Sequence, residues 1–148
     1  MRKALVRLPG EMFDLIFTTS RASAEAFCWP EPFALISITD PGSQSMRLRQ
    51  PTLVARCDLA FWDLAFVPGD DRVIFDSKMA QKVLRFVTQE CGPAKLLLIH
   101  CEAGISRSAG LANALGAIYG IEVRHQNAEF LSPNPLVIRI LHEAIKGT

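Results

Sequence analysis

A cysteine and an arginine stand six residues apart in the segment HCEAGISRSAG, residues 100–110, directly after the apolar run KLLLI. A thiolate is a strong nucleophile, and a guanidinium offers a planar fork of donors that matches two oxygens of a phosphate group. Gly104, between Cys101 and Arg107, permits a positive φ angle and a close approach of the backbone to a bound group. These residue types at this spacing indicate nucleophilic attack on phosphorus.

The elements around this segment predict how the two side chains are positioned. The run AKLLLIH is short and uniformly apolar, which is typical of a central strand in a parallel sheet, and SAGLANALGAIY predicts a helix that ends at Gly120. Between a strand and a helix, the loop N–H groups and the first helical turn converge to form an anion site. The helix dipole and the Arg107 guanidinium favour a charged sulfur, so we expect Cys101 to be a thiolate at neutral pH.

The rest of the chain supplies strands early and helices late. Asp76 or Ser77 suits the N-cap of one helix, and Asn134 with Pro135 suits the start of the last one. We expect strands over 33–38 and 53–62, and helices over 76–89, about 122–131 and from 135 onward. This order predicts an α/β fold of three layers, with a central, mostly parallel sheet flanked by helices.

Composition limits the classes of partner. The chain has 148 residues, 49% of them hydrophobic, and a formal net charge of +1. This length predicts one domain, residues 1–148, and the charge balance gives no long-range field to attract nucleic acid or an anionic membrane. The segment MRKALVRLPG lacks the apolar core of a signal peptide, and no apolar run approaches the length of a membrane span. We therefore expect a cytoplasmic protein.

Other residues with reactive or charged side chains receive structural interpretations. Cys28, Cys57 and Cys91 have neither C-x-x-C nor zinc-ligand spacing, and we expect them to be thiols buried in the core. Arg47 and Arg49 could line a site for an acidic substrate, but solvated loop charges are far commoner. We interpret His125 and His142 as surface residues.

The segment HCEAGISRS matches the pattern H-C-x-x-G-x-x-R-[ST] of the protein tyrosine phosphatase superfamily. The form C-x-A-G-x-S-R-S resembles its dual-specificity branch, including small bacterial members. LSPNPLVIRIL is similar to the S-P-N segment that opens the last helix of dual-specificity phosphatases. The resemblance extends over about residues 33–145, and the first 30 residues match no part of that family.

The resemblance implies a phosphotyrosine-phosphatase-like fold and a set of roles, with no metal and no cofactor. Cys101 would form a thiophosphoryl intermediate, Arg107 would bind phosphate and stabilise the transition state, and Ser108 would donate a hydrogen bond to the departing sulfur. His100 would support the geometry of the loop rather than transfer protons. The backbone amides that would line the phosphate site belong to Glu102, Ala103, Gly104, Ile105, Ser106 and Arg107.

The family also uses an aspartate, from a mobile loop about thirty residues before the cysteine, to protonate the leaving oxygen. Asp70 and Asp71 have this spacing, because they precede Cys101 by 31 and 30 residues, whereas Asp63 precedes it by 38. In dual-specificity enzymes the acid directly follows a strand, which favours Asp63 at the end of DLAFWD. We favour Asp63 and keep Asp70 and Asp71 as alternatives.

The expected function is hydrolysis of phosphate monoesters, above all phosphotyrosine, with phosphoserine and phosphothreonine as further substrates. Its partners would be phosphorylated proteins or small phosphomonoesters, not nucleic acid or membranes. The alternatives are a phosphatase of a phosphoinositide or nucleotide, and a non-catalytic phosphate-binding module. Lipid phosphatases of the superfamily tend to carry lysines in this loop and EAGIS has none, while a binding module usually lacks the Cys or the Arg.

Overall fold

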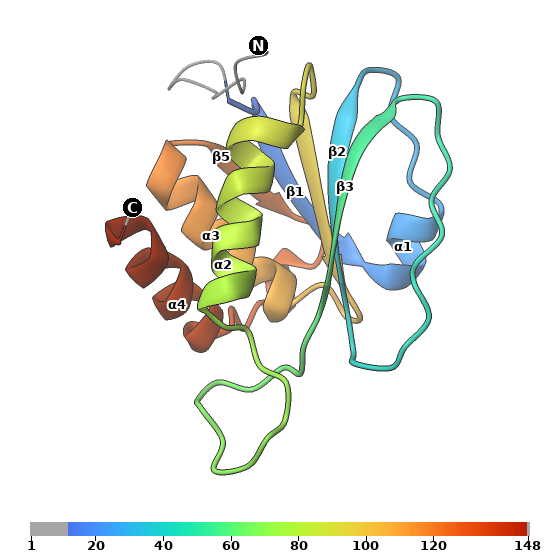
Figure 1. The fold of residues 1–148 in the computed structure, drawn as a ribbon. Coiled ribbons are helices and arrows are strands. Elements are labelled where there is room, and N and C mark those ends of the chain that lie inside the picture. Colours follow the sequence, from blue (N-terminus) through green and yellow to red (C-terminus); the bar gives the residue numbers. More distant parts are fainter. Residues whose placement is uncertain (1–11, 148) are drawn as a thin grey trace.

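A sheet of five parallel strands lies at the centre of the structure, a computed structural model that describes residues 12–147. The strands are β1 (Leu15–Ser20), β2 (Phe33–Thr39), β3 (Leu53–Ala60), β4 (Leu96–Cys101) and β5 (Glu122–His125). Their order is β3-β2-β4-β1-β5, and every neighbouring pair is parallel (Figure 1). The prediction that the run before Cys101 is a central strand is therefore confirmed.

Helices cover the sheet unequally on its two faces. The elements are α1 (Arg21–Glu25), α2 (Ser77–Arg85), the π-helix η1 (Phe86–Glu90), α3 (Arg107–Tyr119), the 3-10 helix η2 (Ala128–Phe130) and α4 (Pro135–Lys146). Figure 1 shows α2, α3 and α4 on one face, and α1 with the long connection between β2 and β3 on the other. The predicted α/β class is confirmed.

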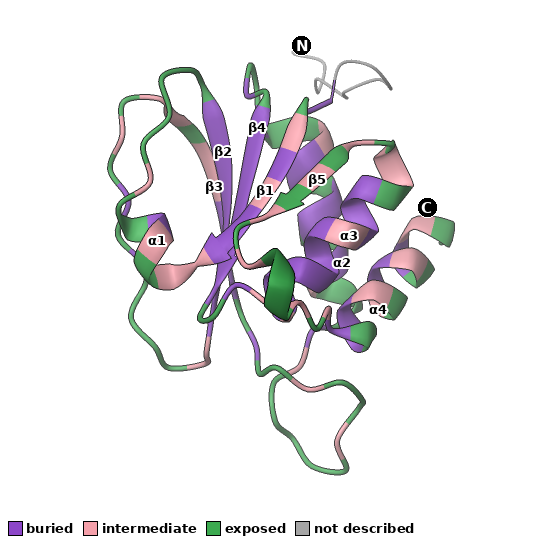
Figure 2. Cartoon of the chain, turned by 180° about the vertical axis from the view of Figure 1, so that it is seen from behind, coloured by how far each residue is buried: buried purple, intermediate pink, exposed green. Residues whose placement is uncertain are grey.

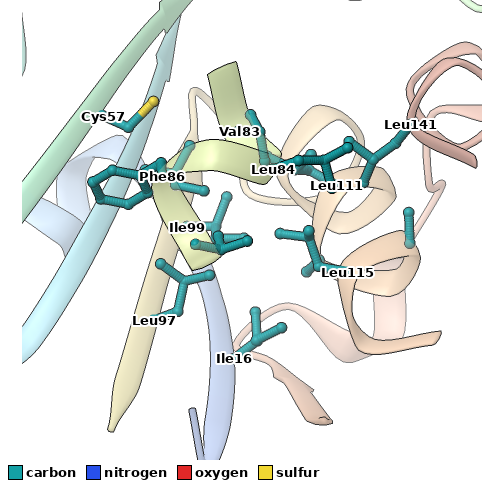
Figure 3. Close-up of a cluster of buried hydrophobic side chains, with 14 of the residues drawn as sticks. Ile16, Cys57, Val83, Leu84, Phe86, Leu97, Ile99, Leu111, Leu115 and Leu141 are labelled. Atoms are coloured by element: carbon teal, nitrogen blue, oxygen red, sulfur yellow. The ribbon is translucent and has the colours of Figure 1, made fainter. Parts of the chain in front are cut away.

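The larger apolar core lies between the sheet and α2, α3 and α4. In Figure 3, Leu97 and Ile99 of β4 point toward α2 and α3, where Leu84, Leu111 and Leu115 meet them. A smaller core on the other face includes Ala24 of α1 and Met46 from the connection between β2 and β3. Because both faces are covered, β4 is buried along its whole length.

Most predicted helix boundaries are confirmed by their capping contacts. Asp76, not Ser77, caps α2, since its side chain accepts a hydrogen bond of 2.9 Å from the amide of Met79. Gly120 ends α3 with a φ of 68°. The side-chain oxygen of Asn134 accepts from the amides of Leu136 and Val137 at 2.9 and 3.1 Å, at the start of α4.

Two sequence expectations about secondary structure are wrong, one of them only at its end. The helix expected over 122–131 is replaced by β5, which pairs with β1, and by η2. Glu122 and Arg124 are exposed while Val123 and His125 are half-buried, which is the alternation of an edge strand. The strand expected over 53–62 ends at Ala60. The helix expected over 76–89 is confirmed, since α2 continues directly into η1 and the two are helical over 77–90.

The connection between β3 and α2, residues 61–76, extends away from the body of the molecule (Figures 1 and 2). Its two ends are joined at the base, where the rings of Phe61 and Phe75 lie 5.3 Å apart and each residue is buried. The amide of Trp62 also donates to the carbonyl of Val73 at 2.9 Å. The base of this connection is therefore fixed to the core, while its tip is exposed.

Residues 12–147 contain no helix that is long and apolar enough to cross a membrane. The interpretation of MRKALVRLPG as lacking a signal-peptide core concerns residues that lie outside the described part of the chain.

Candidate active site

The loop between β4 and α3 is held against the end of β1 by a backbone contact that only glycine allows. Gly104 has a φ of +75°, and a Cβ atom there would lie 2.5 Å from the carbonyl carbon of Thr19 and 2.7 Å from the amide nitrogen of Ser20. On the other side, the side-chain amide of Asn127 donates to the carbonyl of Ala103 at 3.0 Å. The loop is thus fixed by the ends of β1 and β5.

Cys101 is the last residue of β4 and is buried beneath this loop. Its Sγ lies 3.1 Å from the Oγ of Ser108, in the first turn of α3. Ser108 is fully buried, so water does not compete for this contact. The structure thus brings together the two side chains for which the sequence predicted a hydrogen bond.

Arg107, the first residue of α3, is 5% exposed. Its Nη1 donates to Asp40 Oδ1 at 2.7 Å and to the carbonyl oxygen of Phe61 at 2.8 Å. Its Nε has no hydrogen-bond partner, and no other buried side-chain nitrogen or oxygen in the described chain lacks one. An unsatisfied buried donor costs about 1–3 kcal/mol. Arg107 therefore has a donor that is free for a further acceptor.

Asp40 is a site residue that the sequence interpretation missed. It follows β2 directly and pairs with Arg107, with side chains that are 38% and 7% exposed. The signal for it was available, because parallel strands end at one edge of the sheet and a polar residue just after a buried strand reaches that edge. The run FALISIT before Asp40 is buried at every position.

A cavity of about 320 Å³ opens at this edge of the sheet. Three segments form it: the loop after β4, the start of the connection after β3, and the stretch before α4. Its lining residues are Asp63, Cys101, Glu102, Ala103, Ile105, Ser106, Arg107 and Ser132. All of the sequence-predicted site residues thus line the cavity except Gly104, which contacts β1, and Ser108, which lies behind the sulfur.

Asp63 is held in this cavity by two side-chain donors. Its Oδ1 accepts from the Oγ of Ser106 and from the Nδ2 of Asn134, each at 2.7 Å. Ser106 belongs to the loop after Cys101, and Asn134 caps α4. The carboxylate therefore connects the three segments that form the cavity.

Asp70 and Asp71 lie farther along the 61–76 connection and, like Asp63, are exposed. The Arg72 side chain donates to both carboxylate oxygens of Asp70 at 3.0 Å, and this contact lowers the pKa of Asp70. Neither residue is among those that line the cavity. Of the three candidate acids, the structure brings only Asp63 to Cys101 and Arg107.

His100 is fully buried behind the cysteine. Its Nε2 lies 2.6 Å from the Oγ of Ser37 on β2, and its Nδ1 lies 3.2 Å from the carbonyl oxygen of Cys101. Burial lowers the pKa of His100, so the ring is neutral at physiological pH. This arrangement fits a residue that holds the end of β4.

Two sequence interpretations outside the cavity are wrong. Cys28 is exposed rather than part of the core, whereas Cys57 and Cys91 are buried as expected. His125 is not a free surface residue: its Nδ1 lies 2.6 Å from Thr18 Oγ1 and its Nε2 lies 2.9 Å from Asn113 Oδ1.

Arg47 and Arg49 are exposed and do not line the cavity, so they remain solvated loop charges.

A second cavity, of about 260 Å³, lies on the helical face among α2, η1, α3 and α4. Its lining includes Arg85, Thr88 and Tyr119 but no cysteine, histidine or carboxylate. It therefore offers no nucleophile or proton donor of the kind gathered around Cys101.

Comparison with protein-family models finds no match for the chain, and comparison with curated proteins finds none either.

Proposed function

We propose that this chain is a cysteine-dependent phosphatase that hydrolyses phosphate monoesters, with phosphotyrosine in proteins as its preferred substrate. The observation that carries the proposal is the meeting of Cys101, Arg107 and Asp63 on one cavity at the carboxyl edge of a parallel sheet. These are a nucleophile, an oxyanion ligand and a proton donor, which are the groups that phosphoryl transfer requires. The phosphatase-like fold and roles implied by the sequence resemblance belong to the same proposal.

In the first step, the Cys101 thiolate attacks phosphorus. The S–P bond forms while the P–O bond to the leaving group breaks, and the leaving oxygen takes the proton of Asp63. Charge on the phosphoryl oxygens is stabilised by the guanidinium of Arg107 and by the backbone amides of residues 102–107. An oxyanion here would also provide an acceptor for the Arg107 Nε, which has none within the protein.

In the second step, a water molecule attacks the phosphorus of the thiophosphoryl intermediate. The carboxylate of Asp63 accepts the proton of that water, the P–S bond breaks, and Cys101 leaves as a thiolate. The Ser108 hydroxyl, 3.1 Å from the sulfur, donates to the thiolate as its charge returns. Inorganic phosphate is released and the enzyme regains its starting protonation state.

The charges of the cavity favour a substrate with a single phosphate. Arg107 is the one basic residue among those that line it, and Asp63 and Glu102 are acidic. A polyphosphorylated headgroup or a nucleoside triphosphate would place further negative charge beside these carboxylates, and Arg21, the cation that pairs with Glu102 at 3.4 Å, is already engaged by that carboxylate. A phosphomonoester of a neutral aryl group meets no such repulsion.

The test is a hydrolysis panel of phosphotyrosine, phosphoserine and phosphothreonine peptides, a phosphoinositide and a nucleotide, run with and without EDTA. We expect phosphotyrosine to be hydrolysed fastest, EDTA to have no effect, and Cys101→Ser to abolish turnover of every substrate. Activity that survives Cys101→Ser would overturn the proposal. Complete inactivity of the wild type, together with a rise in Tm on adding phosphate, would instead identify a phosphate-binding module.

A further inference from the structure

Every hydrogen-bonding group of the Asn134 side chain has a partner, and these partners fix which end of the side-chain amide is the oxygen and which is the nitrogen. Its Oδ1 accepts from two amides at the start of α4, so the orientation of its side-chain amide is fixed by donors that cannot reverse. Nδ2 must then face the other way, where it donates to Asp63 Oδ1 at 2.7 Å and to the carbonyl of Leu64 at 3.0 Å. Asn134 is 2% exposed, so its capping contacts are shielded from water, while Asp63 itself is exposed and water reaches the contact from the side of the carboxylate.

This arrangement distinguishes the two oxygens of Asp63. Oδ1 has two acceptor positions, and they are filled by Asn134 Nδ2 and by Ser106 Oγ. An amide N–H can only donate, so Oδ1 cannot carry a proton toward Asn134. The structure assigns no such donor to Oδ2. A proton on Oδ1 would have to point at Ser106 Oγ and would displace the hydrogen bond that this hydroxyl donates, whereas a proton on Oδ2 displaces none of the contacts found within residues 12–147. The contacts therefore favour Oδ2 as the oxygen that carries the proton when Asp63 is neutral.

The same contacts fix the position of the carboxyl group. Residues 61–76 extend away from the body of the molecule, and Asp63 lies near the first end of this segment (Figure 1). Asn134 holds two consecutive residues of it, Asp63 through the carboxylate and Leu64 through the backbone, against the N-terminus of α4. The rotation of the Asp63 side chain is thus determined by a helix that is packed into the core.

We propose that Asn134 is the positioning residue of the acid: it aims Asp63 so that Oδ2 delivers the proton to the leaving oxygen. The inference rests on the proposed phosphatase function and deepens it. Asn134 touches neither phosphorus nor the leaving group, and it acts only through Asp63.

The principal test uses Asn134→Ser, because serine preserves an N-cap acceptor for α4 but removes the donor to Asp63. We compare kcat/KM for phosphotyrosine, whose phenolate leaving group needs a proton, with that for dinitrophenyl phosphate, whose leaving group does not. A misplaced acid is expected to lower the phosphotyrosine value about tenfold to a hundredfold and to leave the dinitrophenyl value within about twofold. Asp76→Ser makes the same kind of change at the cap of α2, at a residue that does not line the cavity, and should leave the ratio unchanged.

The double variant Asn134→Ser with Asp63→Asn separates positioning from a general effect on structure. If Asn134 acts only through Asp63, the double variant is no slower on phosphotyrosine than Asp63→Asn alone. The inference would be overturned if the losses in kcat/KM of the two single variants multiply in the double variant. It would also be overturned if Asn134→Ser lowers kcat/KM equally for both substrates. If the wild type hydrolyses phosphotyrosine and Asp63→Asn lowers the rate but Asn134→Ser does not, the inference is overturned and the proposed function stands. Absence of wild-type hydrolysis would overturn both.

Asn134→Asp provides a second measurement if the serine variant does not fold. It keeps the shape and the cap but places a carboxylate where the amide donor stood, so the two acids share a proton. The alkaline limb of the kcat/KM profile is then expected to move to higher pH. An unmoved limb, in a variant with the wild-type Tm, would contradict the contact between Asn134 and Asp63.

Discussion

At the scale of single residues, Arg107 uses one of its terminal nitrogens to hold itself in place. Nη1 is occupied by Asp40 and by the carbonyl of Phe61, which orients the guanidinium from the ends of β2 and β3. The remaining donors of the fork are the ones that a phosphate group would use. If Arg107 binds phosphate as proposed, Asp40 would contribute to that binding without touching the phosphate group.

Arg107→Lys should separate the effect of the positive charge from the effect of the paired guanidinium donors. Lysine can keep an ion pair with Asp40, but it cannot present two parallel donors to phosphate oxygens. We expect kcat to fall about a hundredfold to a thousandfold while the circular dichroism spectrum stays that of the wild type. A kcat within about tenfold of the wild type would mean that this arginine does not stabilise the transition state.

Asp63→Asn tests the assignment of the acid. The variant should lose the alkaline limb of the kcat/KM profile, because that limb reports the loss of the acid's proton in the free enzyme. The loss of rate should be about 10²-fold or more for phosphotyrosine and small for dinitrophenyl phosphate.

Asp70→Asn and Asp71→Asn are the matched controls for this assignment. Neither residue is among those that line the cavity, so neither substitution should change the ratio between the two substrates. Leaving-group dependence in one of these variants, and not in Asp63→Asn, would show that spacing from the cysteine identifies the acid.

At the scale of elements, the loop after β4 depends on its contact with β1. A side chain at residue 104 would collide with the backbone of Thr19 and Ser20, not with a side chain that could rotate away. Backbone can yield only by moving β1 or the loop, and either movement displaces the amides that surround the cavity.

Gly104→Ala should therefore lose activity by much more than its loss of stability explains. We expect the positive φ to cost about 1–2 kcal/mol of unfolding free energy and the collision to lower kcat at least about tenfold. Gly92→Ala is the control, since Gly92 also has a positive φ of 52° but nothing lies within 4 Å of its added Cβ. Equal activity losses in the two variants would mean that the close approach at residue 104 has no functional role.

The sequence predicted the elements whose local signals are strong. β4 is a uniform apolar run, α3 ends at a glycine with a positive φ, and α4 begins at an asparagine that caps it, as capping rules favour. β1 was not predicted, because Thr18 and Thr19 make the second half of this strand polar. Both threonines are buried, and partners far along the chain, His125 and Gln126, satisfy their hydroxyl groups. Such partners become visible only when the strands are assembled.

The candidate site was likewise predicted only where its residues lie close together in the sequence. Cys101, Arg107 and Ser108 lie in one short segment, and the contact between Cys101 and Ser108 follows from a single strand, loop and helix. Asp40 and Asn134 come to the site from other segments through tertiary packing, and no local pattern pairs either one with its partner. The role of Asn134 as a cap was predicted, whereas its contact with Asp63 was not.

At the scale of the whole molecule, the buried histidines link stability to pH. Burial lowers the pKa of His100 and of His125 below the ordinary value of 6.5. Above that value both the folded and the unfolded chain hold these rings neutral. As pH falls through 6.5, the unfolded chain takes up protons that the folded chain does not, so the free energy of unfolding decreases.

We therefore expect the Tm of the wild type to fall between about pH 7.5 and about pH 5.5, above the range in which most carboxylates titrate. His100 alone can contribute at most about 1.4 kcal/mol for each pH unit below its unfolded pKa. His100→Gln should reduce the slope of Tm against pH, whatever its effect on Tm itself. An identical slope in the variant would show that folding does not lower the pKa of His100.

The order of the strands also bears on how the chain can fold during its synthesis. Of the five strands within residues 12–147, β1 leaves the ribosome first, yet both of its neighbours, β4 and β5, are encoded far later in the chain. Translation proceeds at roughly 5–20 residues per second, so β1 waits for several seconds with both edges unpaired. In that interval β2 and β3, which are consecutive in sequence and adjacent in the sheet, can already pair. The nascent chain thus presents an incomplete sheet to chaperones until β4 enters between β2 and β1.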